Sequence, residues 1–153
     1  MITLDDIDLD LCEALQADGR ISYRELGDTV GLSAPAVRDR VRRLEERGVI
    51  TGYRAIIDPA AVGFPIQCVI RLSTAGRSDA NLDDVLRDMP EVVEANRVTG
   101  SESHVVRAHV ETTTHLEDIF HVMWGAADSV TNIVTSSPVP RRPLQLGRAL
   151  RRR

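Results

Sequence analysis

The sequence predicts an α+β fold, in which three N-terminal helices are linked by a strand to a C-terminal βαββαβ unit. Two patterns lead to this expectation. Apolar residues recur at helical spacing over the first third of the chain. Beyond residue 65, segments typical of strands and of helices follow one another in the order of a ferredoxin-like fold. We expect the chain to divide as residues 1–52, a connecting strand and linker at 53–65, the βαββαβ unit at 66–139 and a tail at 140–153.

The first two helices are short and carry recognisable end signals. Thr3 is the expected N-cap of the first helix, which ends near Ala17 before an Asp-Gly turn. Ser22 and Glu25 have the spacing of a capping box at the start of the second helix. Gly31 then ends this helix after about two turns.

Ser33 is expected to cap the third helix. Pro35 is tolerated in its first turn, where the missing N–H needs no partner inside the helix. The inward stripe is formed by Val37, Val41 and Leu44. The opposite side carries Arg38, Asp39, Arg42, Arg43 and Glu46.

The segment after the third helix changes in character. Residues 49–57, VITGYRAII, are apolar and β-branched around one Gly, which predicts a strand that leaves the helical domain. Residues 58–65, DPAAVGFP, read as a linker because they contain two prolines and a glycine.

The second domain is predicted to contain four strands and two helices. The strands are expected at 66–73, 92–98, 104–110 and 131–137, and the helices at 81–88 and 116–124. Thr114 to Glu117 has the pattern of a capping box for the last helix. An apolar stripe on that helix is expected to pack on the sheet; it comprises Leu116, Ile119, Phe120 and Met123.

The third helix concentrates positive charge in an acidic chain. Residues 32–48, LSAPAVRDRVRRLEERG, hold five arginines, although the formal net charge of the chain is -4. Two closely joined helices of which the second is arginine-rich form a helix-turn-helix, whose second helix can enter the major groove of double-stranded DNA. Arginines there can contact guanine edges or phosphates, and small apolar side chains can contact thymine methyl groups. The expected DNA contacts are Ser22, Ser33, Ala34, Pro35, Ala36, Arg38, Asp39, Arg42 and Arg43. The alternative is a solvated helix face with Arg–Glu pairs.

A long stretch of the chain resembles a known family. GLS, then V-x-x-R-V-x-R-L-E-x-x-G-V-I at 37–50 and the following G-Y-R-A-x-x-D-P closely resemble the N-terminal part of the Lrp/AsnC (feast/famine) transcription regulators. The second half resembles the ligand-sensing (RAM) domain of that family, with V-T-G at 98–100. The resemblance covers roughly residues 3–139 and implies a homodimer formed through the sheets, often assembled further into an octamer.

The resemblance also implies an amino acid or related small metabolite as effector, bound between subunits near the loop that begins at Gly100. The implied ligand-binding residues are Val98, Thr99, Gly100, Ser101, Glu102, Ser103 and Thr135. The family usually has G-x-x-D in this loop, whereas this chain has Ser103 at the position of the Asp. That substitution alters or abolishes sensing, and the loop is alternatively only a hairpin turn.

Two other functions remain open. One is an architectural protein that binds DNA with little sequence choice and without an effector. The other is a haem-precursor decarboxylase of similar two-domain plan, for which Arg97, Arg107, His104 and His109 are the candidate residues. Strand alternation places Arg107 and His109 on one face and His104 on the other, which disfavours this enzyme.

The sequence lacks the motifs of several other classes of protein. The chain contains no Gly-rich phosphate loop and no G-x-S-x-G elbow, so we expect no catalytic residues and no enzyme activity. No cofactor and no metal site is expected, and Cys12 and Cys68 are interpreted as small core residues. The acidic start MITLDDIDLD lacks the pattern of a signal peptide, and a membrane-spanning run is missing, so we expect a cytoplasmic protein without membrane contact.

The tail carries the opposite charge to the rest of the chain. Residues 140–153 contain six arginines and no acidic residue, whereas 1–58 and 59–139 are both net negative. Three roles are open for this tail: further phosphate contacts, a strap over a partner subunit, or a disordered segment.

Overall fold

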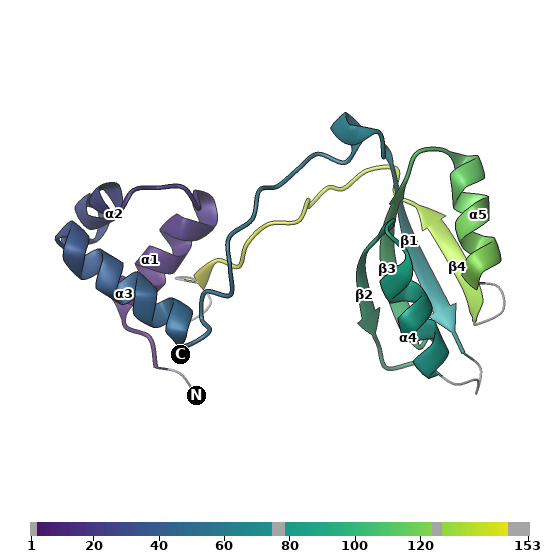
Figure 1. Ribbon diagram of the computed structural model, residues 1–153, viewed down its shortest axis with the longest axis horizontal. Coiled ribbons are helices and arrows are strands. Elements are labelled where there is room, and N and C mark those ends of the chain that lie inside the picture. Colours follow the sequence, from purple (N-terminus) through teal and green to yellow (C-terminus); the bar gives the residue numbers. More distant parts are fainter. Residues whose placement is uncertain (1–2, 75–78, 124–126, 147–153) are drawn as a thin grey trace. The chain divides into compact units, whose positions relative to one another are not determined.

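The computed structural model describes residues 3–74, 79–123 and 127–146 of the chain. By compactness the chain divides into two units, which Figure 1 displays. The N-terminal unit comprises residues 1–56 together with the segment that starts at Val139, and the C-terminal unit comprises residues 57–138.

The N-terminal unit contains three helices: α1 (Asp6–Ala17), α2 (Tyr23–Val30) and α3 (Ala34–Glu46). Their contacts form one small core, whose centre consists of Leu11, Leu26, Val37 and Val41. Each of these four side chains is at most 1% exposed. The predicted inward stripe of α3 is thereby confirmed, and it fixes which face of this helix remains outside.

The start of α1 differs from the prediction. Asp5, not Thr3, is the N-cap residue: its side chain accepts a hydrogen bond from the backbone N–H of Asp8, and the Asp8 side chain accepts one from the backbone N–H of Asp5. A carboxylate is a strong cap because it meets the positive end of the helix dipole. The backbone N–H of Asp8, followed by Arg40, lowers the pKa of Asp5.

The connection between α2 and α3 is very tight. The predicted capping box of Ser22 and Glu25 is confirmed, and α2 ends at Gly31 in the left-handed conformation, with φ of 71°. The backbone carbonyl of Gly27 accepts the N–H groups of both Gly31 and Leu32. A Cβ atom placed on Gly27 would lie 2.3 Å from the carbonyl oxygen of Leu32, so this position requires glycine.

The connecting strand predicted after α3 does not form. Residues 51–58 have no strand assignment, because no other described segment of the chain pairs with them and a strand exists only as part of a ladder. Ile56 is 94% exposed and Ile57 61%. A short 3₁₀ turn, Ala60–Val62, follows near the start of the C-terminal unit.

The C-terminal unit is a four-stranded antiparallel sheet with two helices on one face, and Figure 1 shows both helices against the strands. In chain order its elements are β1 (Ile66–Ser73), α4 (Asp79–Asp88), β2 (Val92–Arg97), β3 (His104–Val110), α5 (Thr113–Met123) and β4 (Asp128–Ile133). The strand order β2-β3-β1-β4 and the βαββαβ sequence confirm the predicted ferredoxin-like arrangement.

Strand alternation separates the two faces of this sheet. Along β3, the residues at alternate positions from His104 to Val110 are buried and the three between them are partly exposed. The buried set packs with α4 and α5, and the predicted stripe on α5 belongs to this core.

Cys12 and Cys68 are buried free cysteines, as predicted, and burial raises the pKa of both thiols.

Four elements of this unit have boundaries that differ from the prediction. The first of them, α4, begins at Asp79 instead of residue 81. The last helix begins at Thr113 instead of Leu116, and the hydroxyl of Thr112 accepts the backbone N–H of His115, so the cap lies two residues before the predicted Thr114. The last strand runs from 128 to 133 instead of 131 to 137, because its register follows β1 from Ser73 back to Cys68. The strand predicted to end at residue 98 ends at Arg97. Trp124, the predicted end of the last helix, lies outside the described residues.

Candidate nucleic-acid interface and ligand loop

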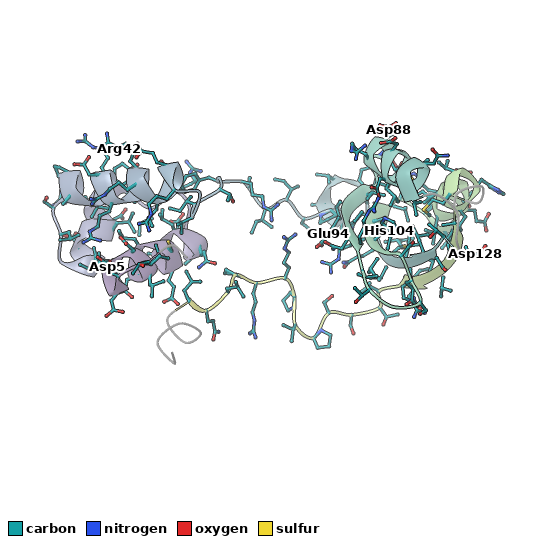
Figure 2. All side chains as sticks on the ribbon, turned by 90° about the horizontal axis from the view of Figure 1, so that it is seen from below. Asp5, Arg42, Asp88, Glu94, His104 and Asp128 are labelled. Atoms are coloured by element: carbon teal, nitrogen blue, oxygen red, sulfur yellow. The ribbon has the colours of Figure 1, made fainter. Side chains whose placement is uncertain are left out.

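The outer face of α3 is available for contact with a partner. Ser33 is the N-cap residue, but its hydroxyl makes no capping hydrogen bond, so it remains free for another acceptor or donor. Pro35 is exposed and Ala34 and Ala36 are half-buried beside it. Figure 2 shows Arg42 on the side of α3 that faces away from α1, where Asp5 lies. Of the predicted contact residues, Ser33, Pro35, Arg38, Arg42 and Arg43 are exposed, and Ala34, Ala36 and Asp39 are half-buried.

The structure sorts the five arginines of this segment into two groups, which sequence reasoning missed. Arg40 lies 2.7 Å from Asp5 and 2.8 Å from Asp8, and its side chain is only 25% exposed. Arg47 donates to the backbone carbonyl of Thr3 at 2.9 Å. Both residues tie α3 to the start of α1. In the sequence, the only indication that Arg40 would bind α1 was the pair of acidic residues Asp5 and Asp8, three positions apart at the start of the predicted first helix.

The remaining arginines face solvent. Arg38 lies 3.7 Å from Asp39, and Arg42 lies 3.9 Å from Asp39 and 3.6 Å from Glu46. Such long, exposed pairs are worth less than about 1 kcal/mol and are screened by salt, so they yield readily to a phosphate. Arg43 is exposed and has no ion pair within the described part of the chain. Three of the five arginines thus lie on the outer face of α3, together with Asp39 and Glu46.

Ser22 has a local role at the start of α2. Its hydroxyl donates to Glu25 at 2.6 Å and accepts the backbone N–H of Glu25 at 3.2 Å. The hydroxyl and then the backbone N–H of Ser22, which both donate to the Glu25 carboxylate, lower the pKa of Glu25. A phosphate contact from this hydroxyl would have to replace its bond to Glu25.

The predicted ligand loop connects β2 to β3 and is anchored from the sheet. The backbone N–H of Ser103 donates to the carbonyl of Leu72 at 2.8 Å, and the backbone N–H of Val98 donates to the carbonyl of Ser103 at 3.0 Å. Ser73 donates to the carbonyl of Ser101 at 3.3 Å. The loop therefore lies beside the end of β1 and is more than a free hairpin turn. Gly100 has a φ of 127°, and Thr99 is exposed.

Glu102 holds the outer part of this loop. The Ser101 hydroxyl donates to its carboxylate at 2.7 Å, and Arg71 lies 3.5 Å away. The hydroxyl of Ser101, the backbone and then Arg71 lower the pKa of Glu102. This carboxylate is therefore charged at neutral pH and remains partly exposed beside the loop.

A polar cluster at the base of the loop was not anticipated. His104 is 2% exposed, and its Nε2 lies 2.9 Å from Asp83 of α4 while its Nδ1 lies 2.9 Å from the Ser103 hydroxyl. Asp83 also forms an ion pair with Arg97 at the end of β2. Ser103, which stands where the family has an acid, is thus linked through the ring of His104 to a carboxylate of α4. Strand alternation had predicted that His104 lies on the opposite face from Arg107 and His109, which the structure confirms, but the sequence did not indicate a partner for it.

Thr135 is not close to the rest of the predicted ligand residues within one chain. It follows β4 and lies next to the Ile66 end of β1, because the backbone N–H of Val134 donates to the carbonyl of Gln67. The loop lies at the other end of β1, six residues away, which is roughly 20 Å along a strand. A single site that contains both would need a second copy of the chain.

The ion pair of Asp83 predicts a pH-dependent contribution to stability. Arg97 first, and then His104, lower the pKa of Asp83 from its ordinary value of 3.8. A carboxyl whose pKa is lower in the folded state stabilises the fold above its unfolded pKa, and this stabilisation is lost as the pH falls through the folded pKa. We therefore expect Asp83→Asn to lower the melting temperature at pH 7, and the difference from the wild type to shrink below about pH 4.

Thermal unfolding followed by circular dichroism from pH 7 to pH 3 checks this expectation. Asp84→Asn is the matched control, because Asp84 is the next residue on α4 and, among the described residues, forms an ion pair with the exposed Arg87 and not with Arg97 or His104. A deficit for Asp83→Asn that persists unchanged at pH 3 would show that the carboxylate charge is not what Arg97 and His104 require.

The described residues hold no group of three or more His, Cys, Asp or Glu side chains that could bind a metal ion. None of the helices in the described ranges has the length and apolarity to cross a membrane.

Comparisons with known proteins agree with both units. A profile of the AsnC-type helix-turn-helix domain matches residues 4–45, and one of the Lrp/AsnC ligand binding domain matches residues 67–144. The transcriptional regulator LrpC of Bacillus subtilis is 30% identical over 133 residues, which cover 87% of this chain and 92% of the relative. LrpA of Mycobacterium tuberculosis is 42% identical over 119 residues, which cover 76% and 78% of the two chains.

Two solved structures are also similar. The structure of B. subtilis LrpC has a TM-score of 0.86 at 28% identity and covers 92% of this chain and 100% of that one. The regulator NMB0573 of Neisseria meningitidis, solved as a complex with L-Met, has a TM-score of 0.83 at 25% identity, with 92% and 94% coverage.

Proposed function

The chain belongs to the Lrp/AsnC family of helix-turn-helix transcription regulators, and on this premise we propose that it binds operator DNA through the outer face of α3. One observation carries the assignment of residues. Arg38, Arg42 and Arg43 lie outside on a helix whose opposite side is buried, whereas Arg40 is held by two carboxylates of the same unit. The three outer arginines are the ones that DNA can reach.

The remaining proposed contacts have different parts in recognition. Ala34, Pro35 and Ala36 lie in the first turn of α3 and suit contact with thymine methyl groups. Asp39 suits the amino group of a cytosine and disfavours a phosphate. Ser33, with its free hydroxyl, and Ser22 are proposed to contact the DNA backbone. These positions give base choice to a surface whose affinity comes mainly from arginine.

We propose a homodimer as the DNA-binding form, assembled further into octamers in some states. Two copies of α3 would then read half-sites about 10 bp apart, or a multiple of that. DNA as the partner also implies action in the cytoplasm. In a second copy of the chain, Thr135 can complete the ligand loop that it does not reach within its own chain.

The effector is proposed to be an amino acid or a related small metabolite, bound at residues 98–103 and Thr135. L-Met in the complex of the Neisseria relative supports this class. Ser103 cannot supply the carboxylate of the usual family loop, but Glu102 precedes it in the loop and Asp83 is linked to it through His104, and the pKa of each carboxyl is lowered. We propose that these carboxylates replace it in holding the amino group of the effector.

A binding titration tests the DNA-binding function. The purified full-length protein is titrated with its own upstream region and with a scrambled DNA of the same composition. We expect clear preference for the native sequence. Equal binding to both DNAs would favour the architectural alternative, and no binding to either would overturn the proposal.

Salt dependence provides a separate prediction. Each phosphate contact contributes a slope of about -0.9 to the logarithm of affinity against the logarithm of salt concentration. Four contacts, two from each half of a dimer, would weaken binding on the order of 100-fold between about 50 and 200 mM salt. A filter-binding or anisotropy series measures this slope. A flat response would exclude phosphate contacts by the exposed arginines.

We propose no enzymatic activity. Arg107 lies beside Glu94 on the open face of the sheet, and His109 shares that face, while His104 is buried under the helices against Asp83. The residues considered for a decarboxylase therefore do not converge on one pocket in the chain.

A further inference from the structure

The chain connects its two units twice. The first crossing lies at residues 56–57, where the connecting segment leaves the helical unit (Figure 1). The second lies at residues 138–139, where the chain returns to the helical unit after the last strand of the sheet. The DNA-binding function proposed above gives no role to this returning segment, residues 139–146.

Both crossings are in contact with the C-terminal end of α1. In the returning segment, the carbonyl of Leu144 accepts a hydrogen bond from the side-chain amide of Gln16 at 3.4 Å, and Leu146 is half-buried. In the connecting segment, the ring of Tyr53 packs beside the turn after α1, since a Cβ atom added to Gly19 would lie 3.5 Å from it. The end of α1 is therefore the place at which both segments are attached to the helical unit.

The two parts of the chain that meet there carry opposite charge. Residues 1–19 contain six acidic side chains and no basic one, whereas residues 140–153 contain six arginines and no acidic side chain. Three of the acidic residues recur at helical spacing along one side of α1: Asp6, Asp10 and Glu13. The last turn of α1 holds no basic residue, although the backbone carbonyls at a helix C-terminus carry a partial negative charge. A cationic segment is therefore favoured at this end of the helix.

The returning segment is well suited to present its charge. Arg141 and Arg142 are both exposed and stand between Pro140 and Pro143. Proline restricts its own φ angle and keeps the preceding residue out of the helical region, so the pair is held in an extended stretch of backbone. Such a stretch has less conformational entropy to lose when it docks.

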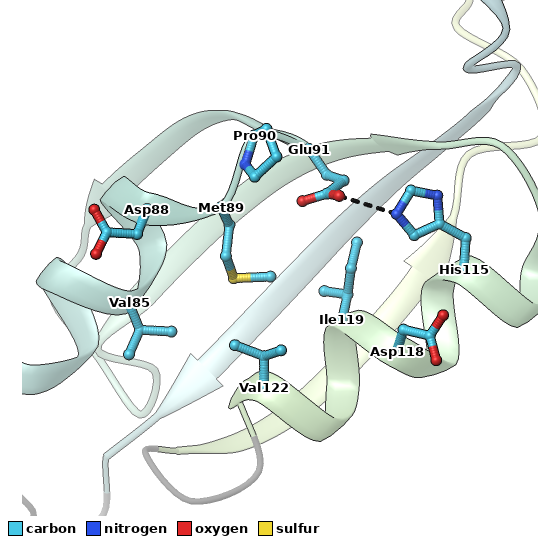
Figure 3. Close-up of a pocket in the computed structure, with 9 residues that line it drawn as sticks. All are labelled: Val85, Asp88, Met89, Pro90, Glu91, His115, Asp118, Ile119 and Val122. Atoms are coloured by element: carbon cyan, nitrogen blue, oxygen red, sulfur yellow. Dashed lines mark hydrogen bonds and ion pairs between the residues drawn. The ribbon is translucent and has the colours of Figure 1, made fainter.

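The other acidic surface of the molecule suits a basic segment less well. It surrounds an apolar groove of about 440 Å³ between α4 and α5. Figure 3 shows the carboxylates of Asp88 and Asp118 on the two outer sides of this groove, pointing away from it. The third carboxylate, that of Glu91, is already paired with His115 at 2.9 Å. These groups do not converge on one position, so α1 is the better surface for the arginines.

We propose that the C-terminal end of α1 is the docking surface for residues 139–146 of the same chain, and that opposite charge holds them there. The docked segment is a second tether between the two units, in addition to the connecting segment. It restrains the motion of the helical unit relative to the sheet. This role needs neither DNA nor an effector, so it stands or falls separately from the function proposed above.

A spin label on the returning segment tests the docking. Gln145→Cys carries a nitroxide at an exposed position next to Leu144 in the full-length ¹⁵N-labelled protein, whose own Cys12 and Cys68 are buried. At about 0.01 M salt we expect the amide signals of residues 13–19 to broaden. At about 1 M salt, where the Debye length falls to about 3 Å, most of this broadening is expected to disappear. Sharp signals at low salt would overturn the proposal.

Two controls identify the source of the broadening. A nitroxide at Glu117→Cys, an exposed position on α5 in the other unit, is expected to leave the amides of residues 13–19 sharp. A mixture of ¹⁵N-labelled protein without nitroxide and unlabelled protein with the nitroxide at residue 145 is expected to do the same. Equal broadening from residue 117 would indicate random collisions, and broadening in the mixture would place the segment on a second copy of the chain. Either result would contradict docking within one chain.

A pair of substitutions tests the charge and the tether together. Arg141→Gln combined with Arg142→Gln is expected to remove most of the broadening at low salt. In ¹⁵N relaxation, the amides of α1 to α3 should then tumble faster relative to those of the sheet. Arg24→Gln combined with Arg87→Gln is the matched control, because it removes the same charge from two exposed arginines outside the tail, and it should change neither property. If both pairs act equally, only net charge matters, and if the first pair has no effect, these arginines do not hold the segment; each outcome refutes the proposal.

Discussion

Replacing Gly27 by alanine will destabilise the N-terminal unit by about 3 kcal/mol. In most helices the same change is stabilising by about 0.5–1 kcal/mol, because alanine restricts the unfolded chain and favours the helix. Here the added Cβ would lie 2.3 Å from the carbonyl oxygen of Leu32. The carbonyl cannot move alone, since the N–H of Leu32 is bonded to the carbonyl of Gly27 at 3.0 Å. The turn that sets α3 against α2 would have to open.

Urea unfolding of the full-length protein, followed by far-ultraviolet circular dichroism and by amide exchange in α1 to α3, measures this effect. The C-terminal unit is expected to keep its protection. Thr29→Ala is the control, because Thr29 is exposed on the same helix and the same residue type is introduced. Wild-type stability of Gly27→Ala would mean that the turn adjusts by a few tenths of an ångström and that close packing of α2 on α3 is not required.

Arg38→Ala combined with Arg42→Ala is expected to reduce affinity for the operator at least 100-fold and to remove the preference over scrambled DNA. An arginine contact to a base edge is worth about 1–3 kcal/mol, and the substitution acts in both halves of a dimer. The weak pairs of these arginines with Asp39 and Glu46 offer little compensation in the free protein, so stability should change by no more than about 0.5 kcal/mol.

Two controls separate DNA contact from structure. Arg87→Ala removes an exposed arginine from the C-terminal unit and is expected to leave both affinity and preference unchanged. Arg40→Ala leaves Asp5 and Asp8 beside each other without their cation, so it should lower stability while the folded fraction keeps its sequence preference. Loss of preference in Arg40→Ala with full stability would move the DNA contact to the other side of α3.

The sequence was sufficient for the start of α2 and the inward face of α3 because local signals determine both, whereas the N-cap of α1 was placed two residues too early. The Ser22–Glu25 box and the inward stripe of α3 depend on residues three or four apart, and local spacing determines both. Local spacing could not predict the partners of Arg40 and Asp83. Arg40 is 35 positions from Asp5, and Asp83 is 21 positions from His104, so only the fold brings each pair together.

The failure at the connecting segment has a different cause. Residues 49–57 have the composition of a strand, but strand formation depends on a neighbour that supplies hydrogen bonds, and composition does not reveal one. The same limit applies to the ends of β4, where the register with β1 and not the apolar pattern sets the boundary. The sequence predicted which residues of α3 lie on its outer face. It could not show which of the arginines form ion pairs within the unit, and the structure was needed for that.

Buried and partly exposed residues alternate strictly along β3, and this alternation fixes the register in which the strand pairs with its neighbours. A slip of one residue against β1 would turn Arg107 and His109 under the helices and expose Val106 and Ala108 to water. A misaligned pairing of β3 with β1 therefore costs the burial of this core and is disfavoured. β2, which carries a bulge between Val92 and Glu94, can absorb an inserted residue far more easily. Variation in length within this unit should accumulate at that edge and in the loops, while β3 keeps its length.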